Sequence, residues 1–492
     1  MSIEQQELGR EASASATYWQ ADAAVASATE LPTLATGERL LSGIWPRSLA
    51  LWMAAFYISL FILRPWEQSF LTWLNDIHFE RLYAISMIVA ALFSLLTSRA
   101  TDWASPRWGA PTDYQNAAVL LFISALGLST LFAPDFDLAW DKFYMALTIV
   151  AFYFVLRIVV RSPYELMFMV TCYIVAMALY MLKAQWEYFM YGRRDYTMGV
   201  TRLIGIETSH GGPNGLAISI VVSLPLWYLL FSNRKYFSAT WSGLYRKFYA
   251  SGLLIYLGLA ICSLIMTRSR AGFVTFVVFL MLMVLRTKGI GRKVSACLGG
   301  LLVLVVLWFS VSDEARSRIR TIWNPEEGRA DAYVSAMGRV EGFRAGIEMF
   351  RKHPLTGIGP GNFVPYRVDN VDGVPLEAHN LVGQVLGEVG ILGALALVLM
   401  VAVTLLNCRR VRQLTTPGHE LGPQQGILYD FATACRDTIL LLIFEGLFDH
   451  NMMRFNWLWL AAFACVALRC AAVKAGETDW RQGFPLRMQP GI

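Results

Sequence analysis

The stretch GRVEGFRAGIEMFRKHPLTGIGPGNF, Gly338–Phe363, is followed after a polar spacer by EAHNLVGQVLGEVGILG, Glu377–Gly393. Together they place two histidines, several arginines and a glycine-rich turn between long apolar segments. Segments buried in lipid host charged groups only at a cost, so a polar loop between such segments is where a membrane protein usually carries its chemistry. The functional residues are therefore expected here.

The composition excludes a water-soluble protein. Of the 492 residues, 56% are hydrophobic and only 16% are charged, whereas soluble domains carry about 25% charged residues. The net charge of +6 requires no nucleic-acid partner, because basic residues on one side of a membrane account for part of it. All seven cysteines lie in or beside apolar segments, which predicts small core residues and no disulfide or metal framework.

Apolar segments long enough to cross the hydrocarbon layer need roughly 20 residues each. We predict an all-α, polytopic integral membrane protein with about twelve transmembrane helices. These helices are expected near 49–63, 80–98, 116–132, 143–161, 164–185, 213–231, 249–267, 271–286, 294–311, 380–406, 427–448 and 454–473.

The remaining segments give the domain organisation. Residues 1–48 lack a basic start and a compact apolar core, so a disordered cytoplasmic tail is expected and not a signal peptide. Helices 1–9 fill 49–311, a long loop covers 312–379, helices 10–12 fill 380–473, and 474–492 form a second tail. Short loops on the side of the N-terminus carry more Lys and Arg, which predicts cytoplasmic termini and an extracytoplasmic long loop.

The segment TRSRAG, Thr267–Gly272, joins two apolar helices on the same outer side. Guanidinium groups bind phosphate oxygens bidentately and stay charged at any working pH. Arg268 and Arg270 therefore suggest a diphosphate clamp. The alternative is a solvated loop with ordinary interfacial anchors.

Thr201–Asn214 contains Arg202 and His210 and runs into Pro213, a residue typical of a first helical turn. The N–H groups at the start of that helix favour an anion, and Arg202 would add positive charge. A plain loop with a helix cap explains the same residues, and His210 alone is a weak signal.

Gly338–Pro354 carries Val340, Phe343, Ile347 and Phe350 at helical spacing. The pattern predicts an amphipathic helix, with Arg344 and Arg351 on its other flank, that ends at Pro354. It lies either along the membrane surface or against the bundle itself.

The turn that follows contains Gly357, Gly359 and Gly361. Glycines allow successive N–H groups to form an anion-binding nest, although a simple tight loop accounts for them equally.

His379 stands where the loop re-enters the membrane, and a histidine there is suited to act as a general base near neutral pH. Glu377 would orient it, or both belong to a helix cap. Glu388, inside an apolar segment, is expected to pair with an arginine or with polar backbone. The chain has no Walker A or HExxH sequence and no convincing metal-ligand spacing. We therefore expect no metal or cofactor, and a substrate that is already activated and delivered in the membrane.

Taken together, RLIGIETSHGGPN, SLIMTRSRAGF and the two segments quoted first resemble the O-antigen ligase and O-antigen polymerase superfamily of bacterial envelope proteins. The most specific element reads HPLxGxGxGNF, then HN, then GExG. The motifs cover about residues 200–395, and the rest is similar by hydropathy.

The resemblance implies a fold similar to C-type glycosyltransferases and a metal-independent transfer, with inversion, from a glycan on undecaprenyl diphosphate. His379 matches the proposed base. The family's arginines match Arg202, Arg268 or Arg270, with Arg270 preferred, and Arg339 or Arg344. The supporting positions that match are Glu377, Asn380, Glu388, Gly359, Gly361 and His353.

A ligase that uses lipid A–core or a similar glycolipid as acceptor is our first hypothesis, and a polymerase acting on another lipid-linked glycan is the second. A lipid-linked glycan flippase is the alternative of another class, but internal repeats, common in transporters, are not evident. The expected location is the bacterial inner membrane, with the active site on the periplasmic face and no nucleic-acid partner.

Overall fold

The computed structural model describes residues 48–67, 71–97, 113–197, 200–205, 212–238, 241–310, 316, 320, 330–416 and 423–474. The chain divides into two units between Arg47 and Ser48, and all of these residues belong to the second. The two expected tails lie outside the described residues, apart from Ser48 and Lys474. His210, Gly211 and residues 312–315 also lie outside them.

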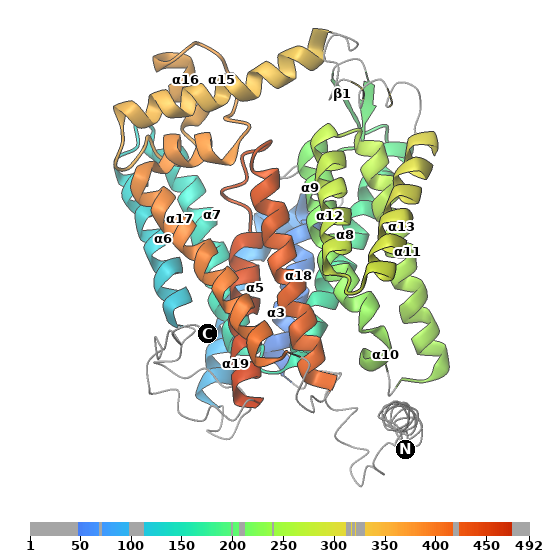
Figure 1. The fold of residues 1–492 in the computed structure, drawn as a ribbon. Helices are drawn as coiled ribbons and strands as arrows, with labels where there is room; N and C mark the ends of the chain where they lie inside the picture. Colours follow the sequence, from blue (N-terminus) through green and yellow to red (C-terminus); the bar gives the residue numbers. More distant parts are fainter. Residues whose placement is uncertain are drawn as a thin grey trace, which may run out of the picture. The chain divides into compact units, whose positions relative to one another are not determined.

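Helices form nearly all of the described structure (Figure 1). In chain order they are α3 (Leu49–Leu63), η1 (Pro65–Glu67), α4 (Trp73–Asp76), α5 (Phe79–Leu96), α6 (Asp113–Leu131), α7 (Phe136–Val159), α8 (Pro163–Met190), α9 (Pro213–Ser232), α10 (Arg234–Phe237), α11 (Gly243–Thr267), α12 (Arg270–Arg286), α13 (Ile290–Ser310), α15 (Ala330–Lys352), α16 (Phe363–Asn370), α17 (Leu381–Leu414), α18 (Pro423–Glu445) and α19 (Asn456–Lys474). A short antiparallel hairpin, β1 (Asp195–Thr197) with β2 (Val200–Arg202), precedes α9.

A helix overlaps each of the twelve apolar segments expected from the sequence. Seven helices of the described chain are both long and apolar enough to cross a membrane, namely α5, α6, α7, α8, α9, α11 and α17. The polytopic membrane architecture is therefore confirmed, while the number of twelve crossings stays a prediction. Large apolar side chains of α5, such as Leu82, Val89 and Phe93, are more than half exposed, as expected for a surface that faces lipid.

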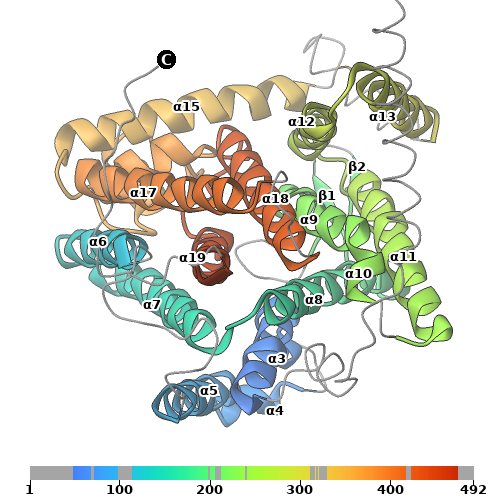
Figure 2. The ribbon, with the colours of Figure 1, turned by 60° about the horizontal axis from the view of Figure 1, so that its bottom comes forward.

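Helix α19 forms the centre of the bundle. Figure 2 shows it among α7, α17 and α18, and its apolar side chains from Trp457 to Ala472 are buried. Because α19 is surrounded by other helices, the turn that precedes it is held in a fixed position at one end of the bundle.

Helix α15 lies across the ends of the membrane helices (Figure 1). It ends at Lys352, just before Pro354, as the sequence predicts. Its buried face consists of Gly338, Gly342, Ala345, Gly346 and Met349. The expected apolar stripe points elsewhere: Val340 and Phe343 are 43% and 41% exposed. The glycine face therefore packs against the rest of the protein, and Val340 and Phe343 face away from it.

Helix α17 contains a break at Gly390, with φ 61° and ψ −161°. Only glycine adopts this backbone region readily. The N–H of Ile391 donates to the carbonyl of Pro354 at 2.9 Å, so the loop after α15 binds backbone groups that the break exposes. The N–H of Gly359 in the same loop donates to the carbonyl of Glu388 at 2.9 Å, so the loop is bonded to α17 on both sides of the break.

The contact of α15 with the start of α17 gives a direct test of this packing. A Cβ atom at Gly342 would lie 2.3 Å from the carbonyl oxygen of Ala378, whereas one at Gly338 would meet nothing closer than 3.9 Å. We expect Gly342→Ala to destabilise the protein by about 1–3 kcal/mol through overpacking, seen as a lower Tm in detergent. Gly338→Ala should leave Tm unchanged or slightly raised, and equal Tm values for the two variants would contradict the packing.

Candidate functional site

His379 lies directly before α17 in an unusual backbone conformation. Its φ is 51°, a left-handed value that is uncommon outside glycine. The next residue, Asn380, caps α17: its Oδ1 accepts from the N–H of Gly383 at 2.5 Å, and its Nδ2 donates to the carbonyl of Ala378 at 2.8 Å. Asn380 therefore fixes the backbone that presents His379, and both polar ends of its side chain are engaged.

The turn between α18 and α19 meets this segment. The N–H of Leu381 donates to the carbonyl of Gly446 at 2.6 Å. This contact brings His450 beside His379, with ring centroids 5.8 Å apart in an edge-to-face arrangement. His450 Nδ1 lies 3.3 Å from Asp449 Oδ1. A base candidate, a second imidazole and a carboxylate thus form one cluster.

Two arginines border the cluster. Arg454 is 4% exposed, and its Nη2 lies 3.5 Å from Asp449 Oδ2. Its Nη1 donates to Ser219 Oγ in α9 at 3.1 Å. Arg339 of α15 donates from Nε to the carbonyl of Phe448 at 3.2 Å. The cluster is therefore surrounded by positive charge from two different elements.

This environment sets the protonation of the cluster. Burial lowers the pKa of His379 to about 4, helped by the charge of His450 when that ring is protonated and by the positive charge of Arg339. His379 is therefore neutral near pH 7 and has a free lone pair, as a general base requires. Burial alone would raise the pKa of Asp449, but His450 and Arg454 outweigh it and hold that pKa below its usual value, so Asp449 is a carboxylate.

Ligand atoms of His379, Asp449 and His450 lie within 4.8 Å of one another, a spacing that would suit a metal ion. However, the guanidinium groups of Arg339 and Arg454 place positive charge beside the single carboxylate. Like charges repel more strongly in a partly buried site than in water. The group is better suited to an anion, and we assign no metal ligands here.

Arg202 and the turn with Arg268 and Arg270 come together in a second cluster. Arg202 is 6% exposed; its Nε donates to the carbonyl of Thr267 at 3.0 Å, and its Nη2 donates to Asn214 Oδ1 at 2.9 Å. Arg268 is half-buried with φ 49°, and the half-buried Arg270 opens α12. These three predicted arginines therefore share one corner of the fold.

The first turns of α9 connect the two clusters. The helix begins at Pro213, as the sequence predicts. Asn214 holds Arg202, and the next residue, Gly215, accepts from Arg454 Nη2 at 3.5 Å through its carbonyl oxygen. Since Arg454 contacts Asp449, polar contacts joined through the peptide between Asn214 and Gly215 connect Arg202 to the histidine pair.

Other predicted residues lie elsewhere. Arg344 is exposed on α15. His353 Nε2 lies 3.1 Å from the hydroxyl of Tyr366 in α16. The side chain of Glu377 is half-buried, and its backbone carbonyl lies against Gly342.

The amide groups of the glycine-rich turn donate hydrogen bonds to another part of the protein. The N–H of Gly359 donates to the carbonyl of Glu388 at 2.9 Å, and the N–H of Gly361 donates to Glu388 Oε1 at 2.9 Å. Both glycines have positive φ, at 92° and 79°. Of the two interpretations left open, the tight loop describes these amides, because an internal carbonyl and carboxylate already occupy them. Glu388 is paired with polar backbone.

The importance of Arg367 was not evident from the sequence. It is fully buried in α16 and forms a bidentate contact with Asp372, with its Nη2 2.8 Å from Oδ2. Its Nη1 donates to the carbonyl of Leu376 at 3.1 Å. Arg367 thereby fixes the spacer that leads to His379. The available signal was an arginine five residues before an acidic residue inside a polar spacer.

The pairing of His450 and Asp449 with His379 was missed as well. The segment DHNMMR, Asp449–Arg454, lies between two apolar segments, a pattern typical of a turn between two membrane helices. This segment lies about seventy residues from His379 along the chain. Local sequence patterns therefore could not predict the contact.

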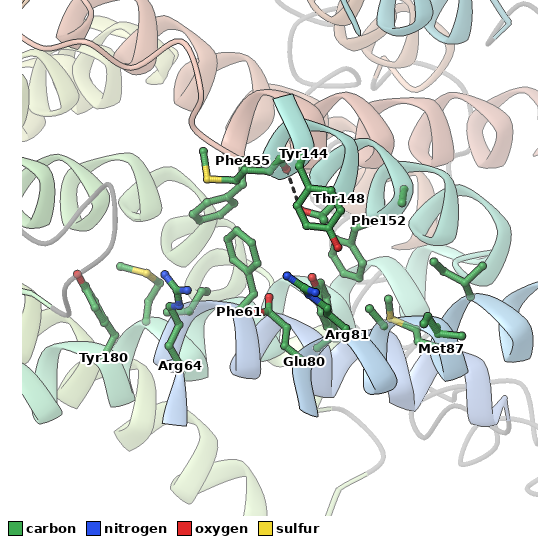
Figure 3. Close-up of a pocket in the computed structure, with 18 of the residues that line it drawn as sticks. Phe61, Arg64, Glu80, Arg81, Met87, Tyr144, Thr148, Phe152, Tyr180 and Phe455 are labelled. Carbon is green, nitrogen blue, oxygen red and sulfur yellow. Dashed lines mark hydrogen bonds between the residues drawn. The ribbon is translucent and has the colours of Figure 1, made fainter. Parts of the chain in front are cut away.

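A cavity of about 550 Å³ opens among α3, α5, α7 and α8. Most of its lining is apolar, and Figure 3 shows Arg64, Glu80 and Arg81 along one wall with Tyr144 and Phe455 opposite. Ser219, which accepts from Arg454, also lines it. The cavity therefore adjoins the residues that position the histidine cluster and combines an apolar interior with cationic side chains.

These features define a polytopic α-helical membrane protein with a cationic, histidine-bearing site built on a loop that crosses the end of its bundle. Residues 255–398 match the model of a protein family described as O-antigen ligase. The match confirms the O-antigen ligase and polymerase superfamily over a region that includes Arg268, Arg270, α15 and His379, and it indicates a ligase-like or polymerase-like function. No curated protein matches the chain.

The Arg367–Asp372 pair predicts a pH dependence of stability. Hydrogen bonds from Arg367 lower the pKa of Asp372, so its stabilising contribution is present above the pKa of the unfolded chain and is lost as the pH falls through the folded value. We expect the Tm of the wild type to fall over this acidic range and that of Asp372→Asn to fall less. The difference should be modest because Asp372 is 35% exposed and screened; parallel Tm curves would contradict it.

Proposed function

We propose that this protein is an O-antigen ligase-like glycosyltransferase. It transfers a glycan from undecaprenyl diphosphate to a hydroxyl of an acceptor such as lipid A–core, on the periplasmic face of the bacterial inner membrane. The observation that carries the proposal is His379, neutral and surrounded by arginines, inside the region that matches the O-antigen ligase family.

The chemistry follows from these groups. His379 accepts the proton as the acceptor oxygen attacks the anomeric carbon of the donor. The bond from that carbon to the diphosphate oxygen breaks, and the electron pair leaves with the diphosphate. Fixed cations stabilise the charge that develops there, and we assign this role to Arg202, Arg268, Arg270 and Arg339. A diphosphate is already a good leaving group, so the mechanism we propose uses no metal.

The cavity supports a lipid-linked donor. An apolar space of about 550 Å³ suits part of a prenyl chain, because burial of each CH₂ contributes about 0.8 kcal/mol. Arg64 and Arg81 at its wall add positive charge along the path of an anionic lipid. We therefore place the prenyl chain in the cavity among α3, α5, α7 and α8, and the diphosphate toward Arg202, Arg268, Arg270 and Arg339.

A polymerase is the second candidate, because the matched family region carries no feature that selects the acceptor. In that case the attacking hydroxyl belongs to another lipid-linked glycan, while the roles of His379 and the arginines stay the same.

Transfer by purified protein tests the proposed function. With a lipid-linked glycan donor and lipid A–core, we expect a shift of the acceptor glycolipid in gels, and His379→Ala should slow it by about 10²–10⁴-fold, the usual contribution of a general base. Arg270→Ala should also slow transfer, through loss of charge on the leaving diphosphate. His78→Ala is the matched control, since His78 is an exposed histidine that also has a φ of 51°.

The assay also separates the alternatives. A ladder of longer lipid-linked glycans without an acceptor shift would identify a polymerase. Full activity of His379→Ala would refute the base assignment, and absence of both products with a matched donor would favour a flippase.

The cavity assignment has its own test. Ala84 of α5 lines the cavity, and Ala84→Phe should exclude part of the prenyl chain. Loss of about two buried CH₂ groups costs about 1.6 kcal/mol, which corresponds to roughly a tenfold higher KM for the donor. Val89→Phe, on the exposed face of the same helix, should leave KM unchanged, and an unchanged KM for Ala84→Phe would exclude this location.

A further inference from the structure

His450 is a half-buried titratable group that the mechanism above does not use. Its ring lies edge-to-face with that of His379, at a centroid distance of 5.8 Å. Its Nδ1 is 3.3 Å from Asp449 Oδ1 but has no hydrogen-bond partner among the described residues. The imidazole of His450 thus lies near the Asp449 carboxylate but is not hydrogen-bonded to it.

A purely structural role does not account for His450. Arg454 already holds Asp449 and joins it to α9. Asn451 anchors the same turn by donating to Glu445 Oε2 at 2.6 Å and to the carbonyl of Leu442 at 2.8 Å. The turn is therefore fixed by its other polar residues, and the His450 ring is available for another task.

The charges around the histidine pair are unequal. The carboxylate of Asp449 lies beside both imidazoles, those of His379 and His450. The other charged or titratable groups that face the pair come from α15, α16 and α18 and from the turn itself; they are Arg339, Arg367, Glu445 and Arg454. With cations in excess, a second positive charge on the pair is disfavoured.

We propose that His450, positioned by Asp449, takes up the proton that His379 removes from the acceptor hydroxyl. This inference rests on the proposed transferase function. As the acceptor oxygen bonds to the anomeric carbon and the diphosphate departs with the electron pair, the proton moves from the hydroxyl to His379. It then passes to His450, which leaves His379 neutral, and returns to solvent after product release. His450 acts through His379 and is a positioning residue.

The geometry allows this step. Ring nitrogens of both histidines belong to a set of atoms within 4.8 Å of one another, a gap that one bridging water or a small ring rotation closes. His379, whose pKa lies near 4, holds a proton poorly, whereas the Asp449 carboxylate supplies the compensating charge for a protonated His450. Transfer away from His379 therefore places the positive charge next to its counter-ion.

The test compares His450→Gln, Asp449→Asn and His379→Ala with the double variant of His450→Gln and His379→Ala. We expect His450→Gln to lower kcat by at least about tenfold, within the roughly 10²–10⁴-fold range of positioned proton transfer, with KM unchanged for both substrates. The acidic limb of its kcat profile should shift from that of the wild type, because the charge of a protonated His450 helps to lower the pKa of His379. Asp449→Asn should lower kcat in the same direction.

The double variant separates a relay from an independent effect. If His450 acts through His379, the double variant is no slower than His379→Ala alone, since residues that act as a unit are not additive. Multiplying losses, or a His450→Gln variant with the wild-type kcat and pH profile, would overturn the relay. His78→Gln should behave as wild type.

The same experiment distinguishes the two levels of the proposal. A wild type without transferase activity in the ligase and polymerase assays overturns the proposed function and the relay with it. An active wild type with an unaffected His450→Gln overturns the relay alone. Tm values of all variants show whether a loss of kcat comes from misfolding.

Discussion

The close approach of two backbones, α15 and the segment that leads into α17, is the constraint on which the site depends. Gly342 and Gly346 lie so near the carbonyls of Ala378 and Gly383 that a single added carbon would collide with them. Dispersion forces fall steeply with separation. Two backbones therefore attract each other strongly only where no side chain holds them apart. Because the contact surrounds His379, the crossing helix and the candidate base form one rigid piece.

Buried arginines, each with more than one polar partner, organise the polar interior around the candidate site. Arg202, Arg367 and Arg454 are each buried and each bound by a carboxylate, an amide or a backbone carbonyl from another segment. A buried guanidinium with fixed partners keeps its orientation when a ligand arrives, which is the condition for electrostatic preorganisation. The cost of burying these charges is thus offset locally, and the net positive field remains available to an anionic substrate.

The sequence was sufficient for the features that depend on local periodicity. Long apolar segments predicted helices, Pro213 marked the start of α9, and helical spacing with Pro354 bounded the crossing helix. It was insufficient where distant segments meet. Glycines 359 and 361 fit a nest or a tight loop equally well until Glu388 was found on their amides. The contact of His379 with the Asp449–His450 turn is a tertiary one, set by the central position of α19, and no local pattern encodes it.

The break at Gly390 divides α17 into two mechanical parts. Its first turns are bonded to the loop after α15 and to the turn before α19, and Ile391 and Leu392, directly after the break, are bonded to the same loop. The helix as a whole is long and apolar enough to span lipid. A bilayer that changes thickness tilts its spanning helices. The loop after α15 is bonded on both sides of the non-helical joint at Gly390. Such tilting is therefore absorbed in α17 beyond Leu392, so the geometry around His379 is insulated from changes in membrane thickness.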